Sequence, residues 1–210
     1  MIARGLAVLA LGVPLLCGAA RAEEYDLRDL RVGMRSDELP ATGYTGFACE
    51  TGPALQGWQE YKRCAPDAAG SRAVRFRYDE AENFRGSVND KYEGTRVAGH
   101  PVLLALLLDD AGIVKGLRIE TDPAARPFLH KKAHLLGGLA KARFGEDGWT
   151  CTQAQPSAAE EPVGGVFVKE HCEKTTPTRR YLVDRALFRR PGEEPRNVVN
   201  STRVEILAAR

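Results

Sequence analysis

Two histidines in one polar segment are spaced as the first half of a helical metal site. His130 and His134 are four residues apart, which would place both imidazoles on one face of a helix. Lys131 and Lys132 stand between them and would repel a cation, and no acidic third ligand follows at helical spacing. We therefore expect a solvated polar surface at these residues, with no bound metal and no other cofactor.

A serine, an aspartate and a histidine of one polar segment could form a hydrolytic triad. These are Ser87, Asp90 and His100, but the sequence around Ser87 lacks the nucleophile elbow that exposes a catalytic serine. Any loop of this composition would offer the same three residue types. Hydrolysis therefore ranks third among the functions considered, and we expect a protein without enzymatic activity.

Four of the five cysteines form two local pairs, Cys49 with Cys64 and Cys151 with Cys172. Four cysteines allow three pairings, and the two local ones are the simplest. Neither spacing fits the C-x-x-C of a redox motif or the ligand spacing of a zinc site. We expect two structural disulfides, each joining two neighbouring antiparallel strands and each contributing about 3 kcal/mol to stability. Redox or metal chemistry remains the alternative.

Arginines cluster on or beside the predicted strands, and Tyr92 and Arg96 lie in the polar segment 83–100. Arginine is favoured where carboxylates or other planar anions are bound. The alternative is a solubilising sheet face whose charges are neutralised by nearby acidic residues. The candidate partner-binding residues are Arg75, Arg77, Tyr92, Arg96 and Arg180.

Residues 1–22 have the pattern of a secretory signal peptide, with a basic start, an apolar stretch and the cleavage site Ala20-Arg21-Ala22. Lipid attachment at Cys17 is not favoured, because Leu16 precedes it where a small residue is usual. Removal of Arg4 and Arg21 would reduce the 30 basic residues to 28, equal to the 28 acidic ones. We expect a periplasmic protein with no nucleic-acid partner and only indirect membrane contact.

Periodicity predicts two helices and nine strands. Ser36 could cap a helix within 27–39, and apolar residues at three- and four-residue steps favour a second helix within 123–144. Val74, Phe76 and Tyr78 alternate with arginines, as in a strand with one buried face. Residues 83–100 are predicted to form a long loop. The predicted strands are 45–50, 57–64, 73–78, 102–108, 113–121, 149–153, 166–172, 180–188 and 203–207.

This order of elements predicts an α+β fold with antiparallel sheets. A helix followed by strands that contain a cysteine pair occurs twice, and Gly46-Phe47-Ala48-Cys49 is similar to Gly148-Trp149-Thr150-Cys151. We therefore expect an internal duplication. The two similar modules would be 23–121 and 122–210, each a helix packed on a short antiparallel sheet clipped by a local disulfide.

The segment from Leu30 to Leu39, with its Val32-Gly33-Met34 opening, resembles the start of modules in the BamE (SmpA/OmlA) group of outer-membrane assembly lipoproteins and in the tandem β-lactamase inhibitor protein. The disulfide expected in each half resembles the tandem inhibitor arrangement. The resemblance implies a short helix followed by an antiparallel meander, in a non-catalytic module that uses its sheet or loops to bind another protein.

The sequence therefore favours an exported protein that binds a periplasmic or envelope protein as an accessory, assembly or inhibitory factor. Contact is expected at the segment 83–100 and at the two loops inside the cysteine pairs, 51–57 and 153–165. The second-ranked function is binding of a small anionic ligand between the two modules by the arginines.

Overall fold

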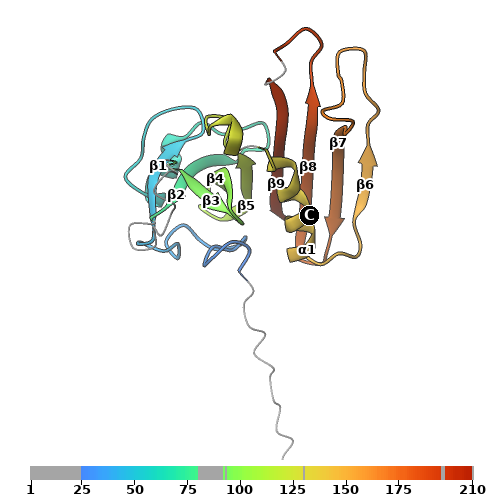
Figure 1. Ribbon diagram of the computed structural model, residues 1–210. Helices are drawn as coiled ribbons and strands as arrows, with labels where there is room; N and C mark the ends of the chain where they lie inside the picture. Colours follow the sequence, from blue (N-terminus) through green and yellow to red (C-terminus); the bar gives the residue numbers. More distant parts are fainter. Residues whose placement is uncertain (1–24, 80–91, 93, 130, 195–196, 210) are drawn as a thin grey trace, which may run out of the picture.

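Segments of alternating or continuous apolar residues form the strands of one large sheet (Figure 1). The computed structural model describes residues 25–79, 92, 94–129, 131–194 and 197–209. Every strand pairing is antiparallel, in the order β1-β2-β4-β5-β9-β8-β7-β6, and β3 also pairs with β4. The strands are β1 (Tyr44–Cys49), β2 (Arg72–Tyr78), β3 (Thr95–Val97), β4 (His100–Leu108), β5 (Val114–Thr121), β6 (Thr150–Gln153), β7 (Val168–Thr175), β8 (Arg179–Arg189) and β9 (Val198–Ala208).

The expectation of two separate helix-plus-sheet modules is wrong, because the last strand, β9, pairs with β5 and makes the sheet continuous. Leu117 of β5 lies opposite Ile206 of β9, and Ile119 lies opposite Val204. All four side chains are at most 5% exposed. Pairing these strands satisfies two rows of backbone groups and buries apolar surface, whereas two separate sheets would leave both edges open. The structure gives the expected duplication no support.

The helix expected within 27–39 is absent, and the segment forms turns and short pairings instead. Leu30, Val32 and Met34 are buried, a period of two rather than of a helix. The Gly33 N–H donates to the carbonyl of Val114 at 2.8 Å, and the Val114 N–H donates to that of Met34 at 2.9 Å. Pairing with the start of β5 thus decides the conformation, and the helix that the module resemblance implied does not form.

The second predicted helix is shorter than expected. Residues 123–144 contain the 3-10 turns η2 (Pro127–Leu129) and η3 (Ala133–Leu135), followed by α1 (Leu136–Arg143). Ala133 and Leu136 are buried as the periodicity predicts. The His134 N–H donates to the Asn200 side chain at 2.9 Å instead of continuing a helical ladder, so regular α-helix begins only after it. Helix α1 covers one face of β8 and β9 (Figure 1).

Both predicted disulfides form, but only one joins neighbouring strands. Cys151 of β6 lies directly opposite Cys172 of β7, as predicted. Cys49 ends β1, whereas Cys64 follows the 3-10 helix η1 (Trp58–Arg63). The strand expected at 57–64 is therefore wrong. Its two buried aromatic residues are three positions apart, a spacing that suits a 3-10 helix.

Most of the core lies on one face of the first five strands, beneath residues 25–43 and η1. Trp58 packs edge-to-face against three aromatic rings, with ring centroids 4.6 to 5.5 Å apart. The continuous apolar run of β4 is covered on both faces as expected, because Leu104 and Leu106 point into this core while Ala105 and Leu107 are buried on the other face. Within the segment expected to form a long loop, residues 95–97 form β3, and 83–91 and 93 lie outside the described residues.

Candidate functional site

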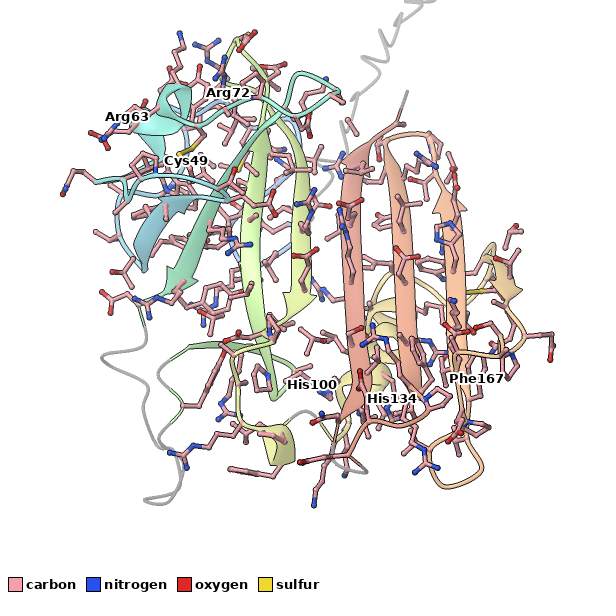
Figure 2. All side chains as sticks on the ribbon, turned by 90° about the horizontal axis from the view of Figure 1, so that it is seen from above. Cys49, Arg63, Arg72, His100, His134 and Phe167 are labelled. Atoms are coloured by element: carbon pink, nitrogen blue, oxygen red, sulfur yellow. A yellow bond between two sulfur atoms is a disulfide. The ribbon has the colours of Figure 1, made fainter. Side chains whose placement is uncertain are left out.

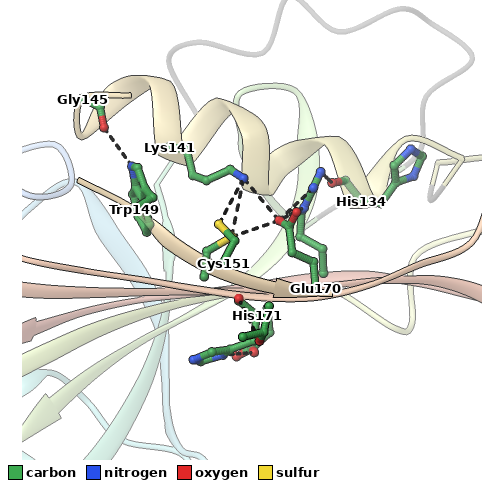
Figure 3. The surroundings of a disulfide bond; sticks show 11 residues. His134, Lys141, Gly145, Trp149, Cys151, Glu170 and His171 are labelled. Carbon is green, nitrogen blue, oxygen red and sulfur yellow. Dashed lines mark hydrogen bonds and ion pairs between the residues drawn. A yellow bond between two sulfur atoms is a disulfide. The ribbon is translucent and has the colours of Figure 1, made fainter. Parts of the chain in front are cut away.

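The second half of the sheet has one covered and one open face. Figure 3 shows α1 on one side of β7, with His171 projecting on the other. A row of directly opposed residues crosses five strands on this open face: Glu120, Arg203, Asp184, His171 and Thr152. Directly opposed residues project to the same side of a sheet. We call the side of β5 to β9 that carries this row the open face.

The charges of the open face are arranged as an ion-pair network. Arg118 donates to Glu50 and to Glu205, at 2.8 Å in each case, and Arg203 also binds Glu205, at 2.6 Å. Arg203 reaches Glu120 at 3.3 Å. Burial favours the protonated form of Glu205, but hydrogen bonds and charge from Arg203 and Arg118 outweigh it and lower the pKa of this carboxyl. The network therefore favours the ionised form of Glu205.

His171 and Asp184 form a hydrogen-bonded pair on the open face, with 2.7 Å between Nδ1 and the carboxylate, and both side chains are about half exposed. Such a pair can orient an imidazole as a base. Thr152 lies directly opposite His171, but its hydroxyl donates to the His171 carbonyl at 3.5 Å, and among the described residues only Asp184 bonds to the imidazole. The described residues that contact the pair do not complete a hydrolytic site.

A cleft of about 590 Å³ lies on the open face and crosses the junction between β5 and β9. Arg75, Glu120, Arg203 and His171 are among its lining side chains. A second groove of about 950 Å³ lies at the far end of β8 and β9, where apolar side chains that include the half-exposed Phe128 are flanked by Arg126 and Arg190.

The two edges of the sheet differ. The outer edge of β1 is closed by its own chain, because the Cys49 N–H donates to Pro53 at 3.0 Å and the Leu55 N–H donates to Phe47 at 2.9 Å. At the opposite edge, β6 pairs only with β7, and all four of its residues are exposed. Within the described chain no backbone hydrogen bond is made to its outer side.

The pairing register shows which backbone groups of β6 point outward. The Ala154 N–H donates to Lys169 at 2.8 Å, continuing the ladder to β7. Hydrogen-bonded and non-hydrogen-bonded pairs alternate along an antiparallel ladder. Cys151 and Gln153 therefore belong to the non-hydrogen-bonded pairs with Cys172 and Glu170. Their N–H and C=O groups point away from β7, toward the open edge.

The structure brings four of the five candidate partner-binding residues to the same region. Arg75 and Arg77 project on the same side of β2, two residues apart. The Arg96 guanidinium lies 5.1 Å from the centre of the Tyr92 ring, and the charge of Arg77 also acts on that phenol. Burial and the hydrogen bond to Asp122 at 2.7 Å raise the pKa of Tyr92.

Arg180 is separate from this group. It lies on β8, with β4, β5 and β9 between it and β2, and donates to Glu173 at 2.7 Å. Arg75 likewise reaches Glu50, at 3.8 Å. Both arginines therefore have acidic neighbours. This agrees with the alternative interpretation, a sheet face whose positive charges are neutralised by acidic residues.

The structure describes only some of the histidine, serine and aspartate residues that the sequence offers for metal binding or hydrolysis. Ser87, Asp90 and His130 lie outside the described residues. His100 begins β4 and lies close to His134 (Figure 2), whose Nδ1 is 3.2 Å from the Asn200 side chain. Partial burial, followed by the positive charge of His134 and Lys132, lowers the pKa of His100.

The Cys151–Cys172 disulfide lies between β7 and helix α1 among charged side chains (Figure 3). The Lys141 Nζ is 3.6 Å from the sulfur of Cys172 and 4.0 Å from that of Cys151. Glu170 contacts the Cys172 sulfur at 3.1 Å and forms ion pairs with Lys141 at 3.2 Å and Arg185 at 2.8 Å. Burial opposes ionisation of Glu170, but these two cations outweigh it and lower the pKa of the carboxyl.

Cys151, Cys172 and Glu170 also form the one group of three potential metal ligands found in the described part of the chain. Their ligand atoms lie within 4.8 Å of one another. Both sulfurs are used in the disulfide, however, and the Lys141 ammonium occupies the space beside them. This chemistry does not fit a metal centre.

Sequence reasoning missed Lys141, Glu170 and the carboxylates of the network. Glu205 and Arg118 each stand between two apolar residues of a strand, an alternation that indicates exposure on a shared face. Only the pairing of β5 with β9 places them opposite each other. Lys141 has no such signal, because its approach to the disulfide depends on how α1 packs.

Comparisons with models of known protein families, with curated proteins and with solved structures find no match for this chain. The two disulfides indicate an oxidising compartment outside the cytoplasm. None of the described helices combines the length and the apolar character needed to cross a bilayer.

Proposed function

We propose that this chain is a non-catalytic exported protein that binds a protein partner in the periplasm, as an accessory, assembly or inhibitory factor. The unpaired outer edge of β6 supports this function most directly. An exposed edge strand is a ready template for a strand of another chain, and proteins usually blunt such edges with charged residues, proline or bulges. Thr150, Cys151, Thr152 and Gln153 form a short edge strand, but they include no charged residue and no proline, and their register with β7 has no bulge.

The binding mode is addition of one extended segment of the partner to β6. The outward N–H and C=O groups of Cys151 and Gln153 would pair with the partner backbone, which supplies affinity independent of sequence. On the open face Thr152 lies at this edge, with His171 next to it on β7, and these side chains would contact alternate side chains of the added strand. The closed edge of β1 offers no equivalent position.

The ion-pair network suits the rim of such an interface better than its centre. Interface cores are depleted of charge, and arginines already paired with carboxylates gain little from a new acidic partner. Arg118 and Glu205, for example, are only 12% and 14% exposed in their side chains and bind each other. The proposed contact therefore centres on β6.

Site-specific photo-crosslinking tests this proposal. A photoreactive residue in place of Thr152 should give a defined adduct with an envelope protein in living cells, whereas one in place of Lys115 on β5 should not. Gln153→Pro removes an outward N–H and should abolish the adduct. Gln153→Ala removes only the side chain and should keep it.

Two results would contradict the proposal. One is crosslinking at Thr152 no stronger than at Lys115. The other is an adduct that Gln153→Pro leaves unchanged in a protein whose circular dichroism spectrum matches that of Gln153→Ala. An adduct between two copies of this chain would reassign the β6 edge to self-association.

Binding of a small anionic ligand is the second candidate, favoured by the cleft of about 590 Å³ at the junction of β5 and β9. Arg75 and Arg203 line it, but a ligand would compete with their acidic neighbours Glu50 and Glu120. That competition ranks this function second. If this function holds, a dicarboxylate found in a thermal-shift screen should raise the melting temperature of the native protein. The same compound should leave the melting temperature of Arg203→Met unchanged.

A further inference from the structure

The two disulfides of the chain differ in how exposed their cysteines are. Cys49 and Cys64 are 4% and 2% exposed and belong to the hydrophobic core. In the second pair Cys172 is fully buried, but Cys151 is exposed on the edge strand β6. An attacking thiolate must reach one of the two sulfurs, so accessibility alone separates the two disulfides.

The two disulfides also differ in the charged side chains around them. Lys141 and Arg185 carry two positive charges beside the second disulfide, and Glu170 carries one negative charge that both cations bind. The net positive charge favours a thiolate at this position. Lys141 is closer to the sulfur of Cys172, at 3.6 Å, than to that of Cys151, at 4.0 Å. The Glu170 carboxylate is nearer still to the Cys172 sulfur, at 3.1 Å, and opposes a thiolate there, but Lys141 and Arg185 both bind this carboxylate. The charge around the buried sulfur remains net positive, and Cys172 is therefore assigned as the leaving group.

We propose that Cys151–Cys172 is an exchange-active disulfide that reacts with a cysteine thiolate presented on an extended polypeptide segment. The thiolate attacks the sulfur of Cys151 and forms a mixed disulfide there. The Cys151–Cys172 bond breaks, and its electron pair remains on Cys172 as a thiolate beside the Lys141 ammonium. This first step is an exchange without net oxidation.

The mixed disulfide can then resolve in either direction. Attack by the Cys172 thiolate on Cys151 restores the original bond and releases the substrate thiolate. Attack by a second thiolate on the substrate sulfur releases Cys151 instead. Two substrate thiolates are then oxidised to one disulfide, and the pair in this chain, after its two sulfurs take up two protons, is reduced to a dithiol.

The preference for an extended segment comes from the β6 edge and rests on the proposed function, whereas the exchange chemistry does not. A substrate joined to Cys151 would lie where the N–H and C=O groups of Cys151 and Gln153 point outward. Its backbone could pair with β6 while the sulfurs react. A small thiol should therefore react at Cys151 as well, but more slowly than an extended peptide.

The first experiment uses the full-length oxidised protein and reduced glutathione. Samples are quenched with an alkylating agent over time, and each cysteine is assigned by peptide mass spectrometry. We expect glutathione on Cys151 and alkylation of Cys172, while Cys49 and Cys64 remain joined. Opening of Cys49–Cys64 at the same rate or earlier, or glutathione on Cys172, would overturn the proposal.

Lys141 variants distinguish stabilisation of the leaving group from a purely structural role. Lys141→Met should slow the exchange by about three- to tenfold, because a less stabilised thiolate leaves more slowly. Lys141→Arg should restore most of the rate, and the exposed control Lys115→Met should leave it unchanged. If Lys141 only held α1 on the sheet, its loss would expose the sulfurs and speed the reaction. An unchanged or faster rate in Lys141→Met therefore contradicts the assigned role.

A second arm compares glutathione with a cysteine-containing peptide of β-branched sequence at equal thiolate concentration. The peptide should react faster, and Gln153→Pro should remove its advantage without changing the rate with glutathione. Equal rates for both thiols would overturn the preference for an extended segment and count against the β6 edge. Exchange at Cys151 would be unaffected by that outcome.

Discussion

Arg179 and Asp26, 153 positions apart in the sequence, are joined by a salt bridge in which the guanidinium Nε lies 3.0 and 3.1 Å from the two carboxylate oxygens. Asp26 is 6% exposed and also accepts a hydrogen bond from the Val32 N–H at 2.7 Å. Arg179 begins β8 and reaches the carbonyl of Val32 as well, at 3.2 Å. This contact fixes the N-terminal segment, which covers the core of the first half, to the second half of the sheet.

Arg179→Met should destabilise the protein by about 3 kcal/mol, because it leaves the buried Asp26 carboxylate without its cation. Urea unfolding followed by circular dichroism measures the change. Arg35→Met is the matched control, since Arg35 pairs with Asp37 at 3.1 Å and both side chains are about 60% exposed. That variant should change stability by less than about 0.5 kcal/mol. Equal losses in the two variants would show that burial of the pair is unimportant.

Glu205→Gln should lower the free energy of unfolding at neutral pH, and it should lower this free energy much less in acid. The pKa of Glu205 is lowered from its ordinary value of 4.5, so its ionised form stabilises the folded state. This contribution is complete above the unfolded-state pKa and is lost as the pH falls through the folded-state value. The gap in unfolding free energy between wild type and variant should therefore narrow below about pH 4.5. The exposed Glu146→Gln serves as control, and a gap independent of pH would contradict the assignment.

The adjacent glycines of α1 should respond to alanine in opposite ways. A Cβ at Gly137 would lie 2.4 Å from the Arg185 side chain and 2.8 Å from that of Val183, whereas one at Gly138 would meet nothing within 4 Å. Gly138→Ala should stabilise the protein by about 0.5–1 kcal/mol through helix propensity. Gly137→Ala should destabilise it by about 1–3 kcal/mol through overpacking. The melting temperatures of the two variants test this prediction. A higher melting temperature for Gly137→Ala than for the native protein would contradict the close packing of α1 on the sheet.

The two halves should unfold together, because they share the β5–β9 pairing. The sequence offers a probe for each half in its two tryptophans, Trp58 beside β1 and Trp149 beside β6. In Trp149→Phe the fluorescence reports the first half alone, and in Trp58→Phe it reports the second half alone. In each variant the fluorescence and far-ultraviolet circular dichroism transitions in urea should coincide. Separate transitions would indicate two independently folding modules.

The spacing of residue types along the sequence was enough to predict those features that depend on interactions between nearby residues. The alternation of Val74, Phe76 and Tyr78 predicts a strand with one buried face, and the structure confirms it. The pairing of Cys151 with Cys172 is also confirmed, because the two cysteines lie on consecutive strands that pair directly with each other. A sheet face whose arginines are neutralised by nearby acidic residues was one of the two alternatives left open by the sequence, which did not identify the carboxylates of the network.

The failures occur where a distant segment supplies the hydrogen bonds. The sequence from Leu30 to Leu39 offers a helix cap, but Val114 and Gly112 provide backbone partners that hold it extended or in turns. Trp58 and Tyr61 fit a strand by composition, yet a core on one side buries both when they are three residues apart in a 3-10 helix.

The sequence by itself therefore determined most of the strands, the two disulfides and the reactive residue types, but not the 3-10 helix η1 or the strand β3. Only the tertiary structure decided that β9 joins β5, that β6 and not β1 has an open edge, and that Lys141 lies beside the sulfur of Cys172. Period-two burial and short-range cysteine pairing are encoded in neighbouring residues. Strand order and the approach of a helix to a sheet depend instead on contacts between segments up to 153 residues apart, which no local pattern specifies.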